Sequence, residues 1–173
     1  PSDRVKSGTF GAVLMKTPEV VAKCCKEMID AVDTEVTVKC RVGVDQQNPD
    51  VTLPKFLEHI SNAGVTRVII HARKAILSGL SPKQNRNVPP LNYELVYKMK
   101  ELFPDLHLSL NGGIQSIKQA KSHLENGIDG VMIGRAAYQK PGEVLIDVDK
   151  YIFNDETSEV TEKDVVKQMI PYI

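Results

Sequence analysis

Four short apolar segments alternate with helical patterns along the chain, and this alternation constrains the fold more than any other feature. The apolar segments cover residues 35–42, 67–70, 106–110 and 130–133. Segments of this length and composition predict strands, and no hairpin-type turn joins one to the next. Strands that are separated by helices run parallel and are linked by right-handed crossovers. The sequence therefore predicts an α/β fold built on a parallel sheet.

Capping residues and apolar periodicity place the helices between these strands. Helices are predicted to begin at Thr17, Asp50, Asn92, Ser116 and Thr161, shorter ones cover residues 10–15, 135–138 and 144–152, and residues 1–8 form a loop. Ser116 and Gln119 are spaced as a capping box. The apolar face of the helix after Thr17 includes Cys24 and Cys25, so we expect both cysteines to be small core residues.

Polar residues or glycines stand at the C-terminal ends of all four predicted strands. They are Lys39 and Arg41, His71 and Arg73, Asn111, Gly112 and Gly113, and finally Gly134 and Arg135. An open doubly wound sheet gathers its functional residues at one switch point, whereas a barrel brings every strand end to one mouth. We therefore interpret residues 1–153 as the C-terminal half, strands five to eight, of a TIM (β/α)8 barrel. Residues 154–173 would form a linker and the start of a C-terminal helical domain.

The last two strands end in glycine, which predicts a phosphate-binding site. Glycine lets the backbone approach a ligand closely, and a helix start presents free N–H groups to an anion. Taken singly, Gly112, Gly113 or Gly134 could be an ordinary turn residue. Two glycine exits on consecutive strands favour phosphate, because barrels place phosphate after strands seven and eight. Arg135 would hold the phosphate oxygens in a bidentate pair of hydrogen bonds.

Lys39 and His71 are candidates for contact with a bound molecule at the same mouth. Lys39 has apolar neighbours and either extends into solvent from the strand or neutralises negative charge on a bound ring. A single histidine at a strand end is often structural, and His71 gains interest because it shares the rim with Lys39 and Asn111. The cysteines show no metal-ligand spacing, so no metal site is predicted.

Residues 74–91 form a long connection, and loops of this length are usually functional or disordered. From His59 through Tyr93 there is no acidic residue. The basic residues of that run are Arg67, Arg73, Lys74, Lys83 and Arg86. Scattered charges often mark only a solvated loop. In a chain with 22 basic and 22 acidic residues, however, an acid-free run beside the mouth suits a phosphate backbone as partner.

The cysteines and the apolar runs indicate a cellular setting. Two of the three cysteines are adjacent, which points to a reduced, cytoplasmic protein. No apolar stretch approaches the roughly 18 residues of a membrane span, and no signal peptide is recognised. The chain begins at Pro1 without a methionine and stops inside a helical pattern, so we expect it to be part of a longer protein.

Five sequence blocks follow one another along nearly the whole chain. They are PSDRV-x-x-G-x-FGA-x-LM, TVKCR-x-G-x-D, IIHARKA-x-L-x-GLSPK-x-NR-x-x-PPL, NGGI-x-S and DGVM-x-GRAAY. Together they resemble the tRNA-dihydrouridine synthases, specifically the DusA subfamily. The resemblance implies a flavoprotein oxidoreductase in which NADPH reduces FMN and the flavin reduces uridine to 5,6-dihydrouridine in the tRNA D-loop, at positions 20 and 20a. It also implies FMN contacts by Lys39, His71, Asn111, Gly112, Gly113, Gly134 and Arg135, and tRNA contacts by Lys83 and Arg86.

The catalytic cysteine of that family, which protonates the uracil ring, precedes a Pro-Ser-Asp-Arg sequence like the one that begins here. The resemblance thus implies a catalytic cysteine immediately before Pro1, none within the chain, and no activity for the chain alone. Two alternatives stay open: an FMN barrel reductase of a small molecule such as dihydroorotate, and a non-catalytic phosphate- or RNA-binding fragment. We expect the full-length protein to be monomeric, and a half-barrel with two free sheet edges to be poorly stable or to self-associate.

Overall fold

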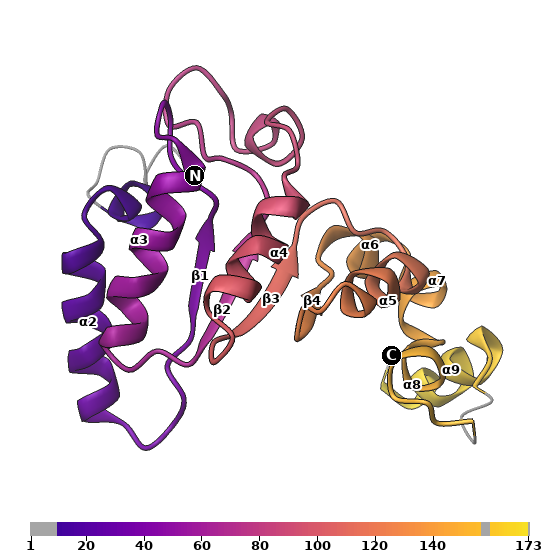
Figure 1. Ribbon diagram of the computed structural model, residues 1–173. Coiled ribbons are helices and arrows are strands. Elements are labelled where there is room, and N and C mark those ends of the chain that lie inside the picture. The colour runs from indigo at the N-terminus through magenta and orange to yellow at the C-terminus, as the bar shows by residue number, and fades with distance from the viewer. Residues whose placement is uncertain (1–9, 157–159, 173) are drawn as a thin grey trace.

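A four-stranded parallel sheet forms the centre of the computed structural model, which describes residues 10–156 and 160–172. The strands are β1 (Val38–Arg41), β2 (Arg67–His71), β3 (His107–Asn111) and β4 (Gly130–Met132), paired in chain order. The predicted α/β fold with a parallel sheet is therefore confirmed, and it is consistent with part of a (β/α)8 barrel (Figure 1). The predicted loop over residues 1–8 lies outside the described residues.

Helices connect the strands in the predicted order. They are α2 (Pro18–Ala31), α3 (Pro49–Asn62), α4 (Tyr93–Leu102), α5 (Ile117–Glu125), α6 (Arg135–Gln139), α7 (Pro141–Leu145), α8 (Val148–Ile152) and α9 (Glu162–Met169). Short 3₁₀ helices cover η1 (Gly11–Lys16), η2 (Gln84–Arg86) and η3 (Ile170–Tyr172). The long connection between β2 and α4 contains η2 but no further helix among the described residues.

The register of the sheet aligns residues from four strand ends, and those of β1, β2 and β3 are polar. Arg41 pairs with His71, His71 with Asn111, and Asn111 with Met132, so these residues form one row across the sheet. Lys39 lies two residues before Arg41 and therefore on the same face. The alternate residues of the strands, such as Cys40, point to the opposite face. The sheet thus presents one face with polar strand ends and one apolar face.

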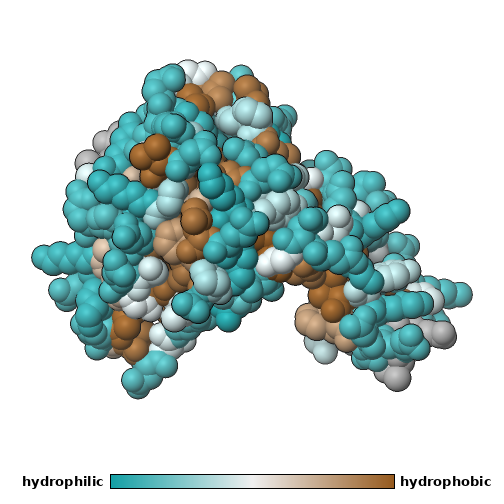
Figure 2. Space-filling view, in the orientation of Figure 1, coloured by the Kyte–Doolittle hydropathy of each residue, from teal (hydrophilic) through white to brown (hydrophobic). Residues whose placement is uncertain are grey.

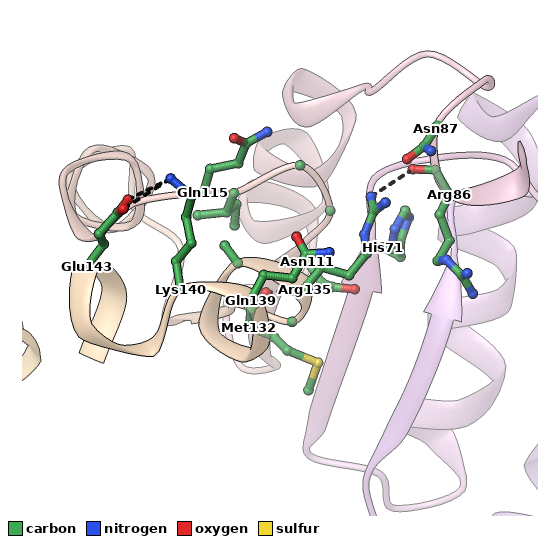
Figure 3. Close-up of a pocket in the computed structure, with 15 residues that line it drawn as sticks. His71, Arg86, Asn87, Asn111, Gln115, Met132, Arg135, Gln139, Lys140 and Glu143 are labelled. Carbon is green, nitrogen blue, oxygen red and sulfur yellow. Dashed lines mark hydrogen bonds and ion pairs between the residues drawn. The ribbon is translucent and has the colours of Figure 1, made fainter. Parts of the chain in front are cut away.

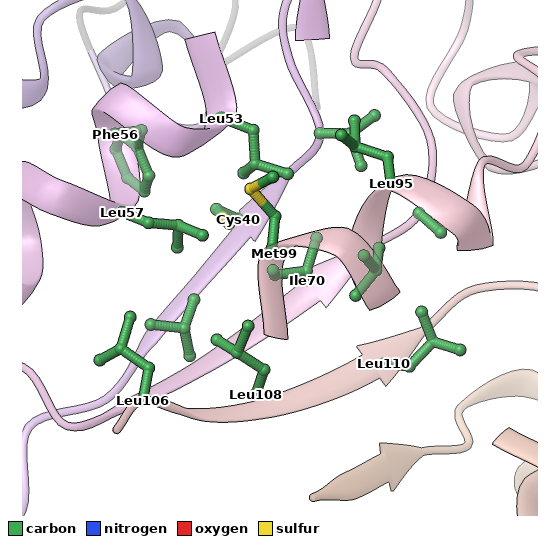
Figure 4. Packing of buried hydrophobic residues seen from close by; sticks show 14 of the residues in the cluster. Cys40, Leu53, Phe56, Leu57, Ile70, Leu95, Met99, Leu106, Leu108 and Leu110 are labelled. Atoms are coloured by element: carbon green, nitrogen blue, oxygen red, sulfur yellow. The ribbon is translucent and has the colours of Figure 1, made fainter. Parts of the chain in front are cut away.

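The apolar face is covered by α3 and α4, and the core lies between these helices and the strands (Figure 4). Side chains spaced three or four residues apart on each helix point to the sheet. From α3 these are Leu53, Phe56, Leu57 and Ile60, and from α4 they are Leu95, Val96 and Met99. They meet the buried strand residues Val68, Ile70, Leu108 and Leu110. This is the core that the periodicity predicted for both helices.

The first predicted strand is shorter than expected. Residues 35–42 alternate like a strand, but only Val38–Arg41 pair with β2. The side chain of Glu35 instead accepts hydrogen bonds from Thr66 (2.9 Å) and Arg67 (3.0 Å) at the start of β2. Because the partner strand begins at Arg67, the residues before Val38 have no ladder to join.

Two helix starts differ from the prediction. The third helix was expected to open at Asp50, but its cap is Asn48, whose side chain accepts from the Asp50 N–H (3.1 Å), with Pro49 in the first turn. Thr17 does precede α2, yet its hydroxyl donates to the Leu14 carbonyl (3.3 Å) and does not cap the helix. Both helices therefore start within two residues of the predicted positions, but neither is capped by the predicted side chain.

The remaining caps follow the sequence closely. Asn92 accepts from the N–H three residues later (3.1 Å), and Thr161 forms a reciprocal capping box with Asp164. Ser116 accepts from the Gln119 N–H (3.3 Å) as predicted. The reciprocal bond, however, goes to the Gln115 N–H (2.8 Å) and not to Ser116.

The cysteine prediction for α2 is half right. Cys25 is buried against the core, whereas Cys24 is exposed. Neighbouring residues on a helix point about 100° apart, so only one of the two can face α3, on which α2 packs. Cys24 is therefore a surface residue and not a core residue.

The predicted helix over residues 144–152 is two helices in the structure, α7 and α8. Pro141 starts α7 earlier than expected, since its fixed φ suits a first helical turn, and the chain turns at Asp147 before α8. Figure 2 shows hydrophobic side chains at the surface of the C-terminal helices α7 to α9. The exposed ones include Leu145, Val165, Val166 and Met169.

Candidate functional site

A cavity of about 450 Å³ lies at the C-terminal ends of β2, β3 and β4 (Figure 3). Its lining includes six of the seven residues predicted to contact a cofactor: His71, Asn111, Gly112, Gly113, Gly134 and Arg135. The seventh, Lys39, is not in the lining, but its ammonium donates to the Asn111 side-chain oxygen (2.9 Å). Parallel pairing therefore brings together residues that lie up to 96 positions apart in the sequence, from Lys39 to Arg135.

Gly112 and Gly113 form a turn that requires glycine at both positions. Their φ angles are +112° and +73°, a region that other residues rarely adopt. A Cβ on Gly113 would lie 2.6 Å from a Leu91 methyl carbon and 2.9 Å from the Tyr93 hydroxyl oxygen. The loop is thus packed tightly from behind and open toward the cavity.

Gly134 has a different role from the other two glycines. Its φ is −106°, and nothing lies within 4 Å of the position that a Cβ would occupy. Backbone strain and packing therefore do not explain a glycine here. The open space lies in the wall of the cavity, so a ligand is free to approach this part of the backbone.

Asn111 links β1, β3 and β4 at the rim. Its side-chain oxygen accepts from Lys39, and its side-chain nitrogen donates to the Met132 carbonyl (2.7 Å). Burial and the nearby charge of Arg41 both lower the pKa of Lys39. Asn111 therefore fixes the position of an ammonium group whose charge is destabilised by burial and by Arg41.

His71 is held neutral in a positively charged environment. Burial lowers the pKa of His71 to about 3, and four neighbouring cations act in the same direction. These cations are Arg41, Lys39, Arg73 and Arg135. The Nδ1 atom of His71 is buried and has no hydrogen-bond partner among the described residues. His71 therefore lines the cavity as a neutral imidazole, with its buried Nδ1 turned toward Gly112 and not toward the open space.

The depressed pKa of His71 makes stability depend on pH. Below the ordinary histidine pKa of 6.5 the unfolded chain takes up a proton that the folded chain excludes, so stability is full above 6.5 and falls as the pH drops toward 3. We expect the free energy of unfolding to fall by up to about 1 kcal/mol per pH unit more in the wild type than in His71→Gln between pH 6 and 4. Urea titrations at several pH values measure this difference, and parallel profiles would contradict it.

Arg135 opens α6 on the other side of the cavity. One of its guanidinium nitrogens donates to the Arg86 carbonyl (3.4 Å), which Figure 3 shows as the contact between the two walls. Arg86 itself lines the cavity, whereas Lys83 does not. The carboxylate of Glu143, also in the lining, is bonded to Lys140 (2.9 Å). The side of the cavity near His71 therefore carries an excess of positive charge.

The family model described as "Dihydrouridine synthase (Dus)" matches residues 1–173, which is the whole chain. The chain belongs to the dihydrouridine synthase family. Within that family its relatives place it in the DusA subfamily. It is 51% identical over 174 aligned residues to the tRNA-dihydrouridine(20/20a) synthases of Salmonella typhimurium (strain LT2) and Escherichia coli (strain K12). It is 48% identical to the protein of that name from Vibrio cholerae.

These relatives are longer than the chain. Each match covers 100% of the chain but 52%, 50% and 53% of the three relatives, in the order given. The chain thus spans about half the length of the curated relatives it matches.

Two arginines at the strand ends hold the long basic loop. Arg41 donates to the carbonyls of Lys74 (3.3 Å) and Asn85 (3.0 Å), and Arg73 donates to the carbonyl of Pro89. Some of the basic residues around the mouth, Arg41 and Arg73, therefore stabilise the loop itself. They tie both ends of the loop to the sheet.

Asn85 organises the interior of the same loop. Its side chain is fully buried, accepts from the Ile76 N–H (2.8 Å) and donates to the Ile76 carbonyl (2.8 Å). Asn85 was not predicted, because nothing in a loop sequence distinguishes a buried amide from an exposed one. It lies between Lys83 and Arg86 in the GLSPK-x-NR block, so it holds the backbone that carries both basic residues.

None of the three cysteines lines the cavity. Cys40 is buried on the helix-covered face of β1, where desolvation raises the pKa of its thiol to about 12. Burial also raises the pKa of Cys25, and Cys24 lies on the surface of α2. Within the described part of the chain, no three His, Cys, Asp or Glu side chains are grouped to hold a metal ion. No helix among the described residues is long and apolar enough to span a membrane.

Proposed function

We propose that the protein is an FMN-dependent tRNA-dihydrouridine synthase and that this chain forms the half of its site that binds the flavin phosphate. In this proposal residues 1–153 are strands five to eight of a (β/α)8 barrel, and residues 154–173 begin a helical domain. The observation that carries the proposal is the cavity in which His71, Asn111 and Arg135 meet the two glycine turns. The relatives that share about half of the sequence are tRNA-dihydrouridine synthases.

The residues present fit the phosphate of FMN. The Gly112–Gly113 turn leaves the backbone uncovered on the cavity side, and Gly134 leaves room for close approach on the other. Arg135 offers a guanidinium whose present contact, at 3.4 Å, is long enough to exchange for a phosphate oxygen. Backbone N–H groups, a guanidinium and a surplus of positive charge make a donor set suited to a phosphate dianion.

Lys39 and His71 are proposed to contact the flavin ring. When bound, FMN that NADPH has reduced supplies the hydride needed to saturate a uracil ring. Lys39, held by Asn111, would neutralise negative charge on the ring, and its lowered pKa reflects a site that favours an anionic neighbour. Neutral His71 would contact the ring through the part of its imidazole that lines the cavity and would not add a further positive charge.

Lys83 and Arg86 are proposed to contact the tRNA backbone. The loop that carries them is acid-free in sequence and is held to the sheet by Arg41, Arg73 and Asn85. A held loop loses little conformational entropy on binding, which favours recognition of a large polyanion. None of the cysteines in the chain lies in the cavity, so the proton donor of the reaction is proposed to come from the cysteine expected before Pro1.

The test compares the full-length protein with a charge-reversed loop variant. With tRNA, FMN and NADPH the wild type should form dihydrouridine, measured by mass spectrometry of digested tRNA. Lys83→Glu combined with Arg86→Glu should weaken tRNA binding by about 20-fold, because each contact to a phosphate contributes to affinity. Since Arg86 also lines the cavity, Lys83→Glu alone should weaken tRNA binding and leave the FMN content unchanged. Lys98→Glu combined with Lys118→Glu makes the same charge change on exposed helix positions and serves as the control.

The outcome separates the proposal from the alternatives. A small-molecule reductase would keep its tRNA-independent NADPH oxidation in Lys83→Glu and would form no dihydrouridine. A non-catalytic phosphate-binding protein would retain FMN without oxidising NADPH. Either result would replace the proposed function.

A further inference from the structure

Tyr93 lies behind the glycine turn and does not line the cavity. It is the first residue of α4, and its hydroxyl donates to the Gly112 carbonyl (2.6 Å). Backbone hydrogen bonds fix the start of α4 beside the strand ends, from the Asn92 N–H to the Ala72 carbonyl (2.8 Å) and from the Ala72 N–H to the Asn111 carbonyl (2.9 Å). The tyrosine therefore connects a fixed helix start to the turn that follows β3.

This hydrogen bond sets the direction of the peptide between Gly112 and Gly113. The described residues contain no cis peptide bond. In a trans peptide the carbonyl and the N–H point in opposite directions. Because the Gly112 carbonyl points back to Tyr93, the Gly113 N–H points to the cavity side of the turn. Among the hydrogen bonds of the described residues this N–H has no acceptor.

The position of the Tyr93 ring is itself constrained. The ring meets His123 of α5 edge to face, with centroids 4.6 Å apart. Burial raises the pKa of the Tyr93 hydroxyl, so the group stays protonated and able to donate near neutral pH. Its oxygen lies 2.9 Å from the place where a Cβ on Gly113 would be. Tyr93 therefore holds the turn by a hydrogen bond and by direct packing.

We propose that Tyr93 is a positioning residue for phosphate binding, which aims the Gly113 N–H at the phosphate of the bound flavin. The inference rests on the proposed function, because it takes the phosphate to be that of FMN. Without the hydroxyl, the peptide is free to rotate, and a donor that was oriented before binding must be oriented during it. The affinity for the phosphate then falls, while contacts to the ring remain.

Tyr93→Phe tests this with little change in shape. FMN and riboflavin, which lacks the phosphate, are each titrated into the full-length protein and followed by flavin fluorescence. We expect Tyr93→Phe to weaken FMN binding about five- to tenfold, the usual effect of one hydrogen bond, and to leave riboflavin binding unchanged. The ³¹P resonance of bound FMN should also shift, since its hydrogen-bonding changes.

Tyr97→Phe is the matched control. Tyr97 lies one helical turn after Tyr93, and its hydroxyl bonds to His123 Nδ1 (2.6 Å) and not to the turn. It should leave the affinity for both flavins unchanged. Equal weakening of FMN and riboflavin by Tyr93→Phe would show a general packing role and overturn the inference, as would unchanged FMN affinity. A wild type that binds neither flavin would refute the proposed function itself.

Discussion

Arg135→Ala in the full-length protein should bind FMN about 100-fold more weakly than the wild type and should purify without yellow colour. Arg135 opens α6 at the cavity wall, and the substitution removes the guanidinium proposed to hold the phosphate. A charge-assisted bidentate contact contributes up to about 3 kcal/mol, which corresponds to this change in affinity. Flavin absorbance after purification and fluorescence titration with FMN measure it.

The control for Arg135 is Arg67→Ala. Arg67 begins β2 at the opposite end of the sheet and bonds to Glu35 (3.0 Å) on the surface. Its loss removes the same charge but leaves the cavity untouched, so flavin content should stay at the wild-type level. An Arg135→Ala protein that purifies fully loaded with flavin would refute the assignment of the phosphate site.

Gly113→Ala should destabilise the protein by about 3 kcal/mol and abolish tight flavin binding. A φ of +73° costs a residue with a Cβ about 1 kcal/mol. The new methyl group would also meet Leu91 at 2.6 Å and the Tyr93 oxygen at 2.9 Å, and overpacking of this kind costs about 2 kcal/mol more. Relief of the clash requires Tyr93 to move, which breaks its bond to Gly112. Urea unfolding and FMN titration measure the two effects.

Gly127→Ala separates the cost of the positive φ from the cost of overpacking. Gly127 also has a positive φ, +89°, but nothing lies within 4 Å of its Cβ position. It should therefore cost only the backbone part, about 1 kcal/mol, and leave flavin binding unchanged. Equal stability of the two variants would show that the space behind Gly113 is not tightly packed.

Local patterns in the sequence predicted the elements well. The helix caps at Asn92, Ser116 and Thr161 were found because a capping side chain and the N–H from which it accepts lie three residues apart. One cap was misplaced by two residues, the Thr17 hydroxyl does not cap its helix, and two other errors arose where a distant group intervened. The first strand was predicted too long because its pairing depends on where β2 begins, and Cys24 was placed in the core because the side of α2 that faces α3 is a tertiary property.

The site was predicted as a set of strand-end residues without positions relative to one another. The alternation of strands and helices indicated one shared rim, and in the structure His71, Asn111 and Arg135 line one cavity. The partners of these residues were beyond reach of sequence reasoning. Asn85 acts through the backbone of Ile76, nine residues away in the same loop, and Tyr93 acts through the Gly112 carbonyl that follows β3.

The order of strands, the glycine turns and the basic loop are thus properties of the chain's own sequence, because each depends on neighbours within a few residues. The row from Arg41 through His71 and Asn111 to Met132, and the Lys39–Asn111 bond, exist only in the folded molecule. Register sets them, and register is chosen by the packing of α3 and α4 on the opposite face of the sheet. If a strand shifted its register by one residue, its side chains in this row would point into the core and no longer to the cavity side of the sheet.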